Sequence, residues 1–403
     1  MTGKPPYIST AMEQAWQAYL QGLEDVRQII FGHRFAEGSR ESNEAHYLFH
    51  QVQAEAFNVA IAPRPDYPHF RTLYDPLTYT WGVPNVDFLY SVAYLDGRRT
   101  YRIWGKRSNS LMVLMQSMNA HLTLPQERIK LLSNRDLDTL QFDKDGNFEI
   151  IASATQHDGN WFKLDPESDR NAIMVREVFG DWENERRTEM HVEAIDDVAP
   201  RPMVHDETTM IRRLEDAVRF MKYCADGVSI KVVEGALAMA GGWNRFAVPK
   251  LGAGQAAAPE ATYNILAYDI GPEDALIVEI DPPNPKYWGV QLSDIWSQAI
   301  DYTYHNCSLN KAQASVDGDG KIRAVICHRD PGIQNWLTPV DSRKGAVFVR
   351  YFFAQGISTP IARLVPYAEL AQNLPEDTAR IAPEVRRAEL KKRRRAIERR
   401  YNY

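Results

Sequence analysis

Two stretches near the N-terminus repeat their apolar residues with the period of an amphipathic α-helix. Residues 15–30 place apolar side chains on one face, after Thr10 and Glu13, which have the spacing of a capping box. The second stretch covers about residues 43–61, and Pro63 ends it because proline lacks the N–H that a helix needs. The pattern therefore predicts a pair of N-terminal helices.

From about residue 73 to residue 195 the pattern changes to short runs rich in β-branched and aromatic residues, which is typical of strands. These runs are LTYTW, FLYSVAYL, TYRIWG, LMVLMQ, FEIIAS, AIMVREV and EMHVEAI. Asp96-Gly97 and Asp145-Gly146 separate several of them, and Asp-Gly favours the type I′ turn of a hairpin. This block predicts a first β domain.

Residues 204–240 return to the helical period, with one helix around 210–223 and another around 229–240. The small-residue stretch LGAGQAAAPE then predicts a linker or loop. A second β block follows, with the runs TYNILAYDI, ALIVEID, YWGVQLSD, KAQASV, KIRAVICH and AVFVRYFFA. A chain of 403 residues is long enough for two hydrophobic cores, so we expect two β domains joined by helices.

The composition is that of an ordinary globular protein, with 44% apolar and 25% charged residues. No run approaches the roughly 18 apolar residues of a membrane span, and the first ten residues lack the apolar core of a signal peptide. We therefore expect a cytoplasmic protein without membrane contacts. Cys224, Cys307 and Cys327 are too few and too scattered for a disulfide framework or a zinc site, so we expect free, buried thiols.

The net charge of −6 hides a basic C-terminus, since residues 386–403 hold nine Lys or Arg against two Glu. Such a block could bind nucleic acid, but no aromatic interleaving or groove-binding motif accompanies it, and the rest of the chain is acidic. We expect no nucleic-acid partner. The block should form a helix that docks on acidic surface, within the chain or on a partner subunit of a homo-oligomer such as a dimer.

Candidate metal and cofactor motifs are incomplete. His46 and His50 share a helical face at i, i+4, but the adjacent Glu of H-E-x-x-H and a third ligand are missing. The acidic turns DKDGNFE and DGDGK lack the Gly and Glu positions of a calcium loop, and LGAGQA lacks the third glycine of a dinucleotide fingerprint. The sequence thus predicts neither a metal nor a cofactor.

Several motifs of the second β block follow one another in a fixed order: YWGVQLSDIW, Asn306, DPGIQNWL and AVFVRYF. These motifs resemble the family catalogued as domain of unknown function 1214, whose pattern combines a "YW-x-L-x-L-x-D" strand, a downstream Asn, a Pro-Gly, "NWL" and an Arg before an aromatic residue. Upstream, PNVDFLYSVAYLD is similar to the Asn-x-Asp-x-x-Tyr element of the companion family 1254, at Asn85, Asp87 and Tyr90.

The resemblance implies two β-sandwich-like domains with connecting helices. The predicted fold is therefore mainly β with added helices: two β-sandwich-like domains, an N-terminal helical pair, a helical connection between the domains and a basic C-terminal helix. The predicted limits are 1–62 for the N-terminal helices, 63–200 for the first β domain (1254-like in part), 201–255 for the helical connection, 256–370 for the second, 1214-like β domain and 371–403 for the basic tail.

Polar residues stand between or at the ends of the aromatic strands of the family-like block. If those strands line a cavity, apolar walls with a few convergent polar groups make a small-molecule site. Tyr304 and His305 could move protons and Arg350 could hold a carboxylate or phenolate oxygen through its planar fork, so these three are the candidate catalytic residues. The candidate substrate-binding residues are Asn85, Tyr90, Trp288, Asp294, Trp296, Tyr302, Asn306, Asn335 and Trp336.

We expect the three catalytic candidates to share one pocket with Trp288, Trp296, Asn335 and Trp336. Tyr302 and Tyr304 would face inward together if that stretch is extended, which leaves Tyr304 and His305 as partial alternatives for the proton-transfer role. The competing interpretation is purely structural, with residues such as Asn335 and Arg350 tying loops to the sandwich.

Without a metal or nucleotide signature, any reaction would rest on side-chain acid–base chemistry. The expected function is a cofactor-independent enzyme of lyase or hydratase type that acts on a small aromatic or hydrophobic molecule. The resemblance implies a place in the bacterial breakdown of aromatic compounds, one suggestion being lyases that act on lignin-derived aromatic dimers. The alternative is a non-catalytic protein that binds a small ligand or a carbohydrate.

Overall fold

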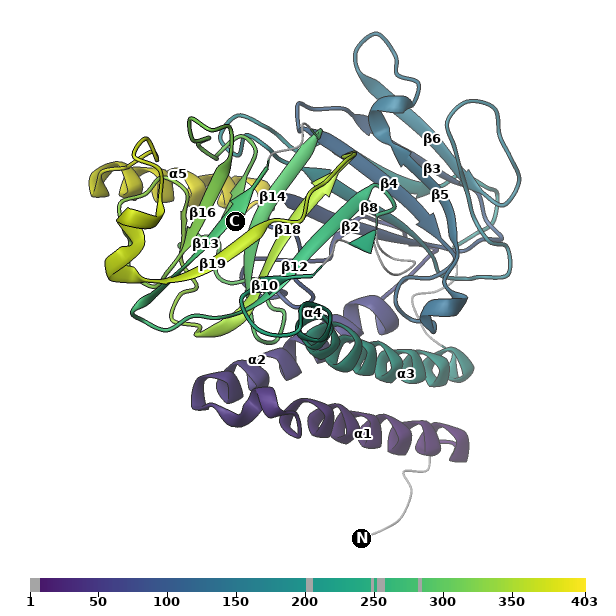
Figure 1. Ribbon diagram of the computed structural model, residues 1–403. Helices are drawn as coiled ribbons and strands as arrows, with labels where there is room; N and C mark the ends of the chain where they lie inside the picture. Colours follow the sequence, from purple (N-terminus) through teal and green to yellow (C-terminus); the bar gives the residue numbers. More distant parts are fainter. Residues whose placement is uncertain (1–7, 201–205, 248–249, 252–257, 282–284) are drawn as a thin grey trace.

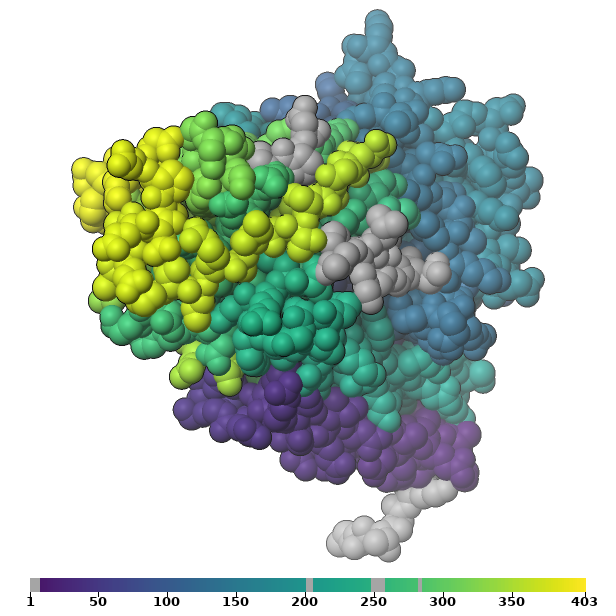
Figure 2. All heavy atoms as spheres, viewed as in Figure 1, coloured from purple at the N-terminus to yellow at the C-terminus, as the bar shows by residue number. Residues whose placement is uncertain are grey.

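The computed structural model describes residues 8–200, 206–247, 250–251, 258–281 and 285–403. Two β-sandwiches stand side by side, and a layer of helices lies against one end of both (Figure 1). The space-filling view shows the first sandwich in blue, the second in green to yellow, and the N-terminal helices in purple beneath them (Figure 2). The predicted fold class is confirmed.

The first sandwich packs a five-stranded sheet, ordered β1-β2-β8-β4-β5, on a four-stranded sheet, ordered β7-β6-β3-β9. Its strands are β1 (Arg71–Thr72), β2 (Phe88–Leu95), β3 (Tyr101–Lys106), β4 (Met112–Met118), β5 (Leu131–Asp136), β6 (Asn147–Ser153), β7 (Trp161–Lys163), β8 (Asn171–Val178) and β9 (Glu189–Ala194). Apolar residues such as Leu95, Ile103 and Val113 fill the core between the two sheets. Because side chains alternate along a strand, the five-stranded sheet turns its other face to the second sandwich.

The second sandwich pairs a sheet ordered β10-β12-β18-β14-β15, with β11 beside β12, and a sheet ordered β17-β16-β13-β19. Its strands are β10 (Arg245–Phe246), β11 (Lys250–Leu251), β12 (Ala261–Asp269), β13 (Asp274–Ile280), β14 (Tyr287–Asp294), β15 (Ser308–Asn310), β16 (Ile322–Ile326), β17 (Trp336–Leu337), β18 (Lys344–Phe352) and β19 (Ile361–Pro366). Leu276, Leu292 and Val347 belong to the core between these sheets.

The β2-β8-β4 sheet and the β12-β18-β14 sheet face each other across the domain boundary, and we call them the inner sheets. Phe88 of β2 packs against Tyr287 of β14 and Phe352 of β18, with ring centroids 5.4 and 5.3 Å apart. Every residue of β8 is buried, because one face lies in the first core and the other faces the second sandwich. A strand covered on both faces is expected to lack the alternating pattern of a surface strand.

The helical layer is built from α1 (Thr10–Phe31), α2 (Ser39–Ala56), α3 (Glu207–Lys222) and α4 (Lys231–Ala240), with two π-helical segments, η2 (Phe57–Ile61) and η5 (Tyr223–Ile230). Short 3-10 turns lie at η1 (Arg34–Glu37), η3 (Gln126–Arg128), η4 (Leu137–Thr139) and η6 (Tyr367–Asn373). Residues such as Val52, Phe220 and Val233 join the inner sheets in one core. None of the helices in the described part of the chain combines the length and the apolar character that a membrane crossing requires.

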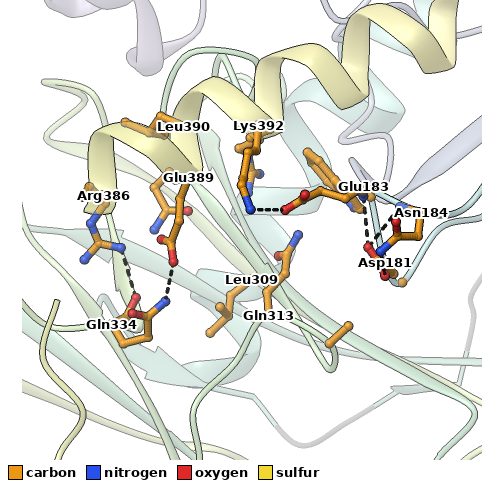
Figure 3. Close-up of a pocket in the computed structure, with 15 residues that line it drawn as sticks. Asp181, Glu183, Asn184, Leu309, Gln313, Gln334, Arg386, Glu389, Leu390 and Lys392 are labelled. Carbon is orange, nitrogen blue, oxygen red and sulfur yellow. Dashed lines mark hydrogen bonds and ion pairs between the residues drawn. The ribbon is translucent and has the colours of Figure 1, made fainter. Parts of the chain in front are cut away.

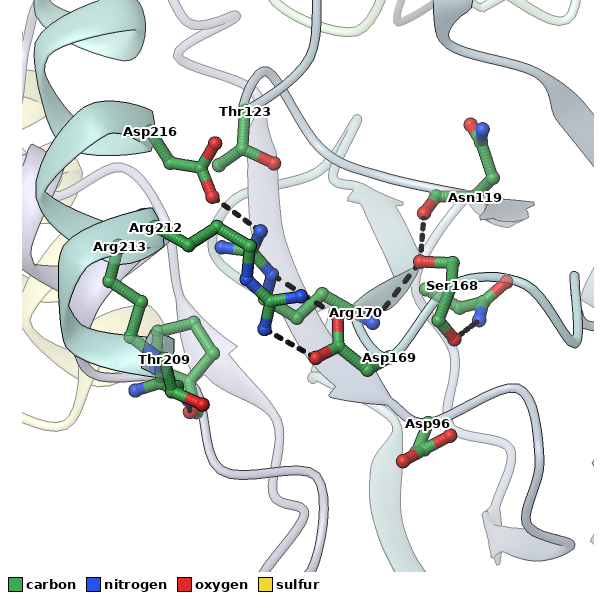
Figure 4. Close-up of polar contacts among 12 residues, drawn as sticks. Asp96, Asn119, Thr123, Ser168, Asp169, Arg170, Thr209, Arg212, Arg213 and Asp216 are labelled. Atoms are coloured by element: carbon green, nitrogen blue, oxygen red, sulfur yellow. Dashed lines mark hydrogen bonds and ion pairs between the residues drawn. The ribbon is translucent and has the colours of Figure 1, made fainter. Parts of the chain in front are cut away.

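Ion pairs fix α3 to the edge of the first sandwich (Figure 4). Arg170, just before β8, pairs with Asp216, which also accepts from Arg219 at 2.6 Å. Arg212 Nη2 lies 2.5 Å from Asp169 Oδ2. Asp216 and Arg170 are largely buried, so these contacts set the position of α3 more strongly than surface pairs would.

The basic C-terminus forms α5 (Pro383–Tyr401), which lies against the second sandwich. Its buried arginines donate mainly to main-chain oxygens and stack on aromatic rings. Arg393 donates to the Tyr302 carbonyl at 2.8 Å, and Arg400 donates to the Val86 carbonyl at 2.7 Å. Both guanidinium groups lie over the Trp182 ring, at 4.3 and 4.5 Å. The predicted helix is present within the chain. It meets acidic residues in part, since Arg386 pairs with Asp330 and Lys392 pairs with Glu183, whereas the contacts of Arg393 and Arg400 are with main-chain oxygens, the Ser308 hydroxyl and aromatic rings.

The structure also differs from the sequence pattern in several elements. LTYTW forms a turn that buries Trp81, and KAQASV is a turn because the Asn310 side chain accepts the main-chain N–H of Ala312 at 3.0 Å. The predicted runs missed the short strands β1, β7, β10, β11, β15 and β17 and the longer strands β5 and β19. Ser9, rather than Thr10, caps α1, through the N–H of Met12. The predicted linker falls largely outside the described residues, and the domain limits stay predictions.

Candidate functional site

The three candidate catalytic residues do not share a pocket. Arg350 is buried on β18, whereas Tyr304 is 48% exposed and lies under Arg394 of α5, with the guanidinium 5.1 Å from the ring centre. His305 lies on the same surface, with Nδ1 3.4 Å from Asp301 Oδ2. The Asp301 carboxylate also accepts the Tyr304 N–H at 3.2 Å, which makes this stretch a turn. Strand alternation therefore does not apply there, and the expectation of an inward-facing pair is wrong.

The candidate aromatic residues of the second sandwich fill cores or hold loops. Trp288 and Tyr302 are buried in the second core. Trp296 packs in the helical layer and donates its indole N–H to the Glu41 carbonyl at 2.8 Å. Trp336 donates to a main-chain carbonyl of its own sandwich at 2.9 Å. None of these four rings lines a cavity with Arg350.

The other polar candidates also make structural contacts. Asp294 accepts from the Gln298 N–H at 2.8 Å, and burial raises the pKa of its carboxyl group to about 8. Asn335 donates to the Ser315 carbonyl at 2.8 Å, and Asn306 donates to a carbonyl of β17. These contacts match the interpretation in which polar residues tie loops to the sandwich.

A cavity of about 470 Å³ lies between the inner sheets and is closed on one side by η5 and α4. Among the predicted site residues, Asn85, Tyr90 and Arg350 line it. The remaining lining residues are Tyr74, Gly82, Val83, Pro84, Phe88, Arg176, Tyr223, Gly227, Val228, Lys231, Val232, Gly235, Met239, Ala247, Ala258, Tyr263, Ile265, Phe348 and Phe352. This inner cavity brings together the upstream and downstream motifs, which the sequence had placed in separate domains.

Segment 83–87 forms one wall of the inner cavity through its residues 83–85, and it is held from several sides. Arg350 donates to the Val83 carbonyl at 2.6 Å, and Gln291 donates to the Pro84 carbonyl at 2.9 Å. Arg400 of α5 donates to the Val86 carbonyl from the far side. Val83 has φ of 46°, a left-handed conformation that is strained for a β-branched residue and persists only when its surroundings hold it.

Asn85 belongs to a buried hydrogen-bond network at the end of this wall. Its amide donates to the Tyr287 hydroxyl at 2.9 Å, and that hydroxyl donates to Asp87 at 2.5 Å. Asp87 also accepts from Trp182 at 2.7 Å and from Asn310 at 2.8 Å. The Asn-x-Asp part of the motif therefore joins both sandwiches, while Asn85 also faces the cavity.

Tyrosines supply the neutral polar groups of the inner cavity. The Tyr90 hydroxyl accepts the Asn85 N–H at 3.1 Å, and burial raises the Tyr90 pKa to about 12, although the nearby guanidinium groups of Arg350 and Arg176 act to lower it. Tyr74 packs edge-on against Tyr90 at 5.0 Å, and burial raises its pKa well above the ordinary value. Both phenols are therefore protonated at neutral pH and can donate hydrogen bonds.

Sequence reasoning missed Arg176, Tyr263 and the η5 segment. Arg176 interrupts the apolar run AIMVREV, much as Arg350 interrupts AVFVRYF, and this repeated signal could have indicated it. Tyr223, Gly227 and Val228 of η5 line the cavity. π-Helical turns are rare and occur frequently at functional sites, which supports this location.

A second cavity of similar size, about 490 Å³, lies under α5 (Figure 3). Most of its polar side chains already have partners within the protein. Lys392 Nζ lies 2.9 Å from Glu183 Oε1, and Gln334 donates to Glu389 at 3.3 Å. Arg386 donates to the Gln334 carbonyl at 3.1 Å. The cavity under α5 therefore has few polar groups left to bind a ligand. We take the inner cavity as the candidate site.

His46 and His50 pack against aromatic rings, with the His46 ring 4.5 Å from Phe31. Within the described ranges no group of three or more His, Cys, Asp or Glu is placed to hold a metal ion. All three cysteines are free and buried.

Residues 91–176 match the model of the family described as "Protein of unknown function (DUF1214)", which supports the predicted family. The match covers most of β2 through β8 in the first sandwich. The family was predicted from motifs in the second β block, so that placement is wrong, whereas the match supports the family itself. No curated protein matches the chain.

Two solved structures align with 88% of the chain. One, described as the crystal structure of a putative uncharacterized protein from Burkholderia cenocepacia, is 24% identical, with a TM-score of 0.80 over 88% of this chain and 97% of that one. The VPA0106 protein from Vibrio parahaemolyticus is 13% identical, with a TM-score of 0.45 over 88% of this chain and 100% of that one. The first likeness shows the fold.

Proposed function

We propose that the protein binds a small, largely aromatic or hydrophobic molecule in the inner cavity. One observation carries this proposal: the cavity combines apolar and aromatic walls with a few polar groups that converge from both sandwiches. This is the usual composition of a small-molecule site, and domain interfaces are a common place for one.

A cofactor-independent enzyme of lyase or hydratase type is the second candidate, and Tyr90 favours it. Its phenol lies beside two guanidinium groups and keeps its proton at neutral pH, so it can act as a general acid. Arg350 could hold a developing oxyanion of the substrate. Tyr90 thus takes the proton-transfer role first expected of Tyr304 or His305. An aromatic compound such as a lignin-derived dimer remains one possible substrate.

The test is native mass spectrometry of the purified protein, followed by identification of the small molecules released on denaturation. Gly235 on α4 lines the cavity, and a Cβ at this position would meet no atom within 4 Å, so Gly235→Leu fills the cavity without a backbone clash. We expect the same aromatic or hydrophobic molecule with wild type and with the matched control Gly235→Ala, and none with Gly235→Leu. Equal recovery from all three proteins would contradict the proposed site.

A further inference from the structure

The polar lining of the inner cavity is rich in hydrogen-bond donors. Four tyrosines line it: Tyr74, Tyr90, Tyr223 and Tyr263. Its cations, which include Arg350, can donate hydrogen bonds but cannot accept them. The Tyr90 oxygen already accepts the Asn85 N–H at 3.1 Å, which leaves the Tyr90 proton to be donated. No hydrogen bond within the described part of the chain uses that proton.

The acceptor oxygens on the wall of the cavity are already bonded. The Val83 carbonyl accepts from Arg350 at 2.6 Å, and the Pro84 carbonyl accepts from a glutamine side chain at 2.9 Å. The Asn85 side-chain oxygen accepts the N–H of Asp87 at 3.1 Å. Among the described residues that line the cavity there is no Asp or Glu, and the residues outside the described ranges contain neither. A ligand that fits this lining therefore has to carry acceptor oxygens of its own.

Tyr90 also indicates which charge a ligand oxygen can carry at this place. Burial raises the pKa of its hydroxyl to about 12, even though the guanidinium groups of Arg350 and Arg176 act to lower it. The loss of water around a negatively charged oxygen therefore outweighs the attraction of the two cations. A carboxylate would meet the same cost, whereas a carbonyl oxygen accepts a hydrogen bond without bringing a charge into the cavity.

The rest of the lining is apolar and aromatic. Phe88 and Phe352 meet between the inner sheets with their ring centroids 5.3 Å apart, and Phe348 lies on the same strand as Phe352. Val228 of η5 and Val232 of α4 add an aliphatic surface from the helical layer. Such walls suit a flat aromatic body that carries few polar groups.

We propose that the ligand is an uncharged aromatic ketone or aldehyde, whose carbonyl oxygen accepts a hydrogen bond from the Tyr90 hydroxyl while its ring packs against Phe88 and Phe352. This inference rests on the proposed function and names the ligand class for the same site. It separates carbonyl compounds from the aromatic acids and hydrocarbons that the size of the cavity alone would admit.

The experiment compares three compounds that share a naphthalene ring: 2-acetylnaphthalene, a ketone; 2-isopropylnaphthalene, which has a similar shape but no oxygen; and 2-naphthoate, an anion. Equilibrium dialysis gives the affinity for each compound. We expect wild type to bind the ketone about tenfold more tightly than the anion, because the charge of the anion must be buried. Tyr90→Phe should weaken ketone binding about tenfold and leave hydrocarbon binding unchanged, since only the ketone loses a hydrogen bond.

Tyr94 lies on the same strand and does not line the cavity, so the matched control Tyr94→Phe should leave all three affinities unchanged. A second measurement needs no variant: infrared spectroscopy of the bound ketone labelled with carbon-13 at the carbonyl group. A hydrogen-bonded carbonyl group absorbs at a lower frequency than a free one. We therefore expect a lower frequency for the bound ketone than for the ketone in heptane, and Tyr90→Phe should remove this shift.

The outcomes separate the two proposals. Tighter binding of the anion than of the ketone, equal losses of ketone and hydrocarbon binding in Tyr90→Phe, or a carbonyl frequency equal to that in heptane would overturn the carbonyl ligand. Loss of binding of all three compounds in Gly235→Leu would still leave the proposed function standing. Binding that Gly235→Leu does not affect, or no binding of any of the three compounds, would overturn both proposals.

Discussion

Two groups of arginines are buried in this molecule, and they have opposite consequences. On α5, Arg393 and Arg400 insert between loops, donate to carbonyl oxygens and cover Trp182. In the inner cavity, Arg350 is held by the oxygens of Gln291 and Val83, and both Arg350 and Arg176 line the open space. Burial alone therefore does not distinguish a structural arginine from a binding arginine. Arg393 also borders the groove under α5, so the presence of a cavity does not make the distinction either. The two cavities differ in their lining: Asp181, Glu183 and Glu389 line the groove under α5, whereas no described residue that lines the inner cavity is an Asp or Glu.

The largest expected effect is a loss of stability when a buried arginine of α5 is replaced. Arg393→Ala should lower the free energy of unfolding by about 3 kcal/mol, because it leaves buried carbonyl oxygens without a donor and removes the contact with Trp182. Arg395 is exposed on the same helix, so Arg395→Ala is the matched control and should be indistinguishable from wild type. Urea unfolding measures both. Equal stabilities of the two variants would remove the structural role assigned to Arg393.

The second prediction concerns the turnover of a substrate bound in the inner cavity. If the protein is an enzyme, Tyr90→Phe should reduce turnover of the co-purifying molecule about 100-fold, since it removes the phenolic proton beside the two guanidinium groups. Tyr94 lies on the same face of β2 but does not line the cavity, so Tyr94→Phe should keep near-normal turnover. A Tyr90→Phe protein that is folded and fully active would favour the binding protein over the enzyme.

A buried carboxyl group gives a third test, with a dependence on pH. Burial raises the pKa of Glu55 to about 8, and its Oε1 has no hydrogen-bond partner among the described residues. The folded state keeps this proton while the unfolded state loses it above its ordinary pKa. The contribution of Glu55 to stability therefore falls as pH rises from about 4.5 to about 8.

Glu55→Gln should remove this fall and so stabilise the protein at pH 8 relative to pH 5, by on the order of 2 kcal/mol. The glutamine oxygen can still accept from Asn58, which preserves the one contact of the carboxylate. Chemical unfolding of both proteins at the two pH values checks the difference. Parallel pH profiles would show that Glu55 does not titrate in this range.

The smallest expected effect is the change in stability caused by the control substitution Gly235→Ala. Gly235→Ala replaces a glycine inside α4 and should raise the free energy of unfolding by about 0.5–1 kcal/mol, because glycine is entropically costly in a helix. Recovery of the co-purifying molecule should not change, since a single methyl group leaves most of the cavity open. A variant of unchanged stability and lowered affinity would show that the cavity is tighter at α4 than the geometry indicates.

The fold could be predicted from periodicity because most strands have a buried, β-branched pattern and most helices an apolar face. The pattern did not predict β5 and β7 because these strands are short or partly polar. It wrongly predicted a strand at LTYTW because a turn can also bury a tryptophan. No sequence window records that the β2 and β18 segments meet across the domain boundary.

The site could be predicted in part, through the motif residues Asn85, Tyr90 and Arg350. Tyr304 and His305 were wrong as cavity residues because a carboxylate-capped turn directs them to solvent. Arg176 was missed because a single arginine in an apolar run does not by itself indicate a binding site. Its significance depends on the facing sheet, which local sequence does not show.

Segment 83–87 has a consequence beyond its role as a wall. One side of it borders the ligand space, and the other is bonded to Arg400 near the end of α5. A ligand that shifts this segment also changes how favourably α5 packs against it. Because coupling is reciprocal, a change in the packing of α5 then changes the affinity for the ligand. We therefore expect ligand binding in the inner cavity and the packing of α5 to be thermodynamically linked through this segment.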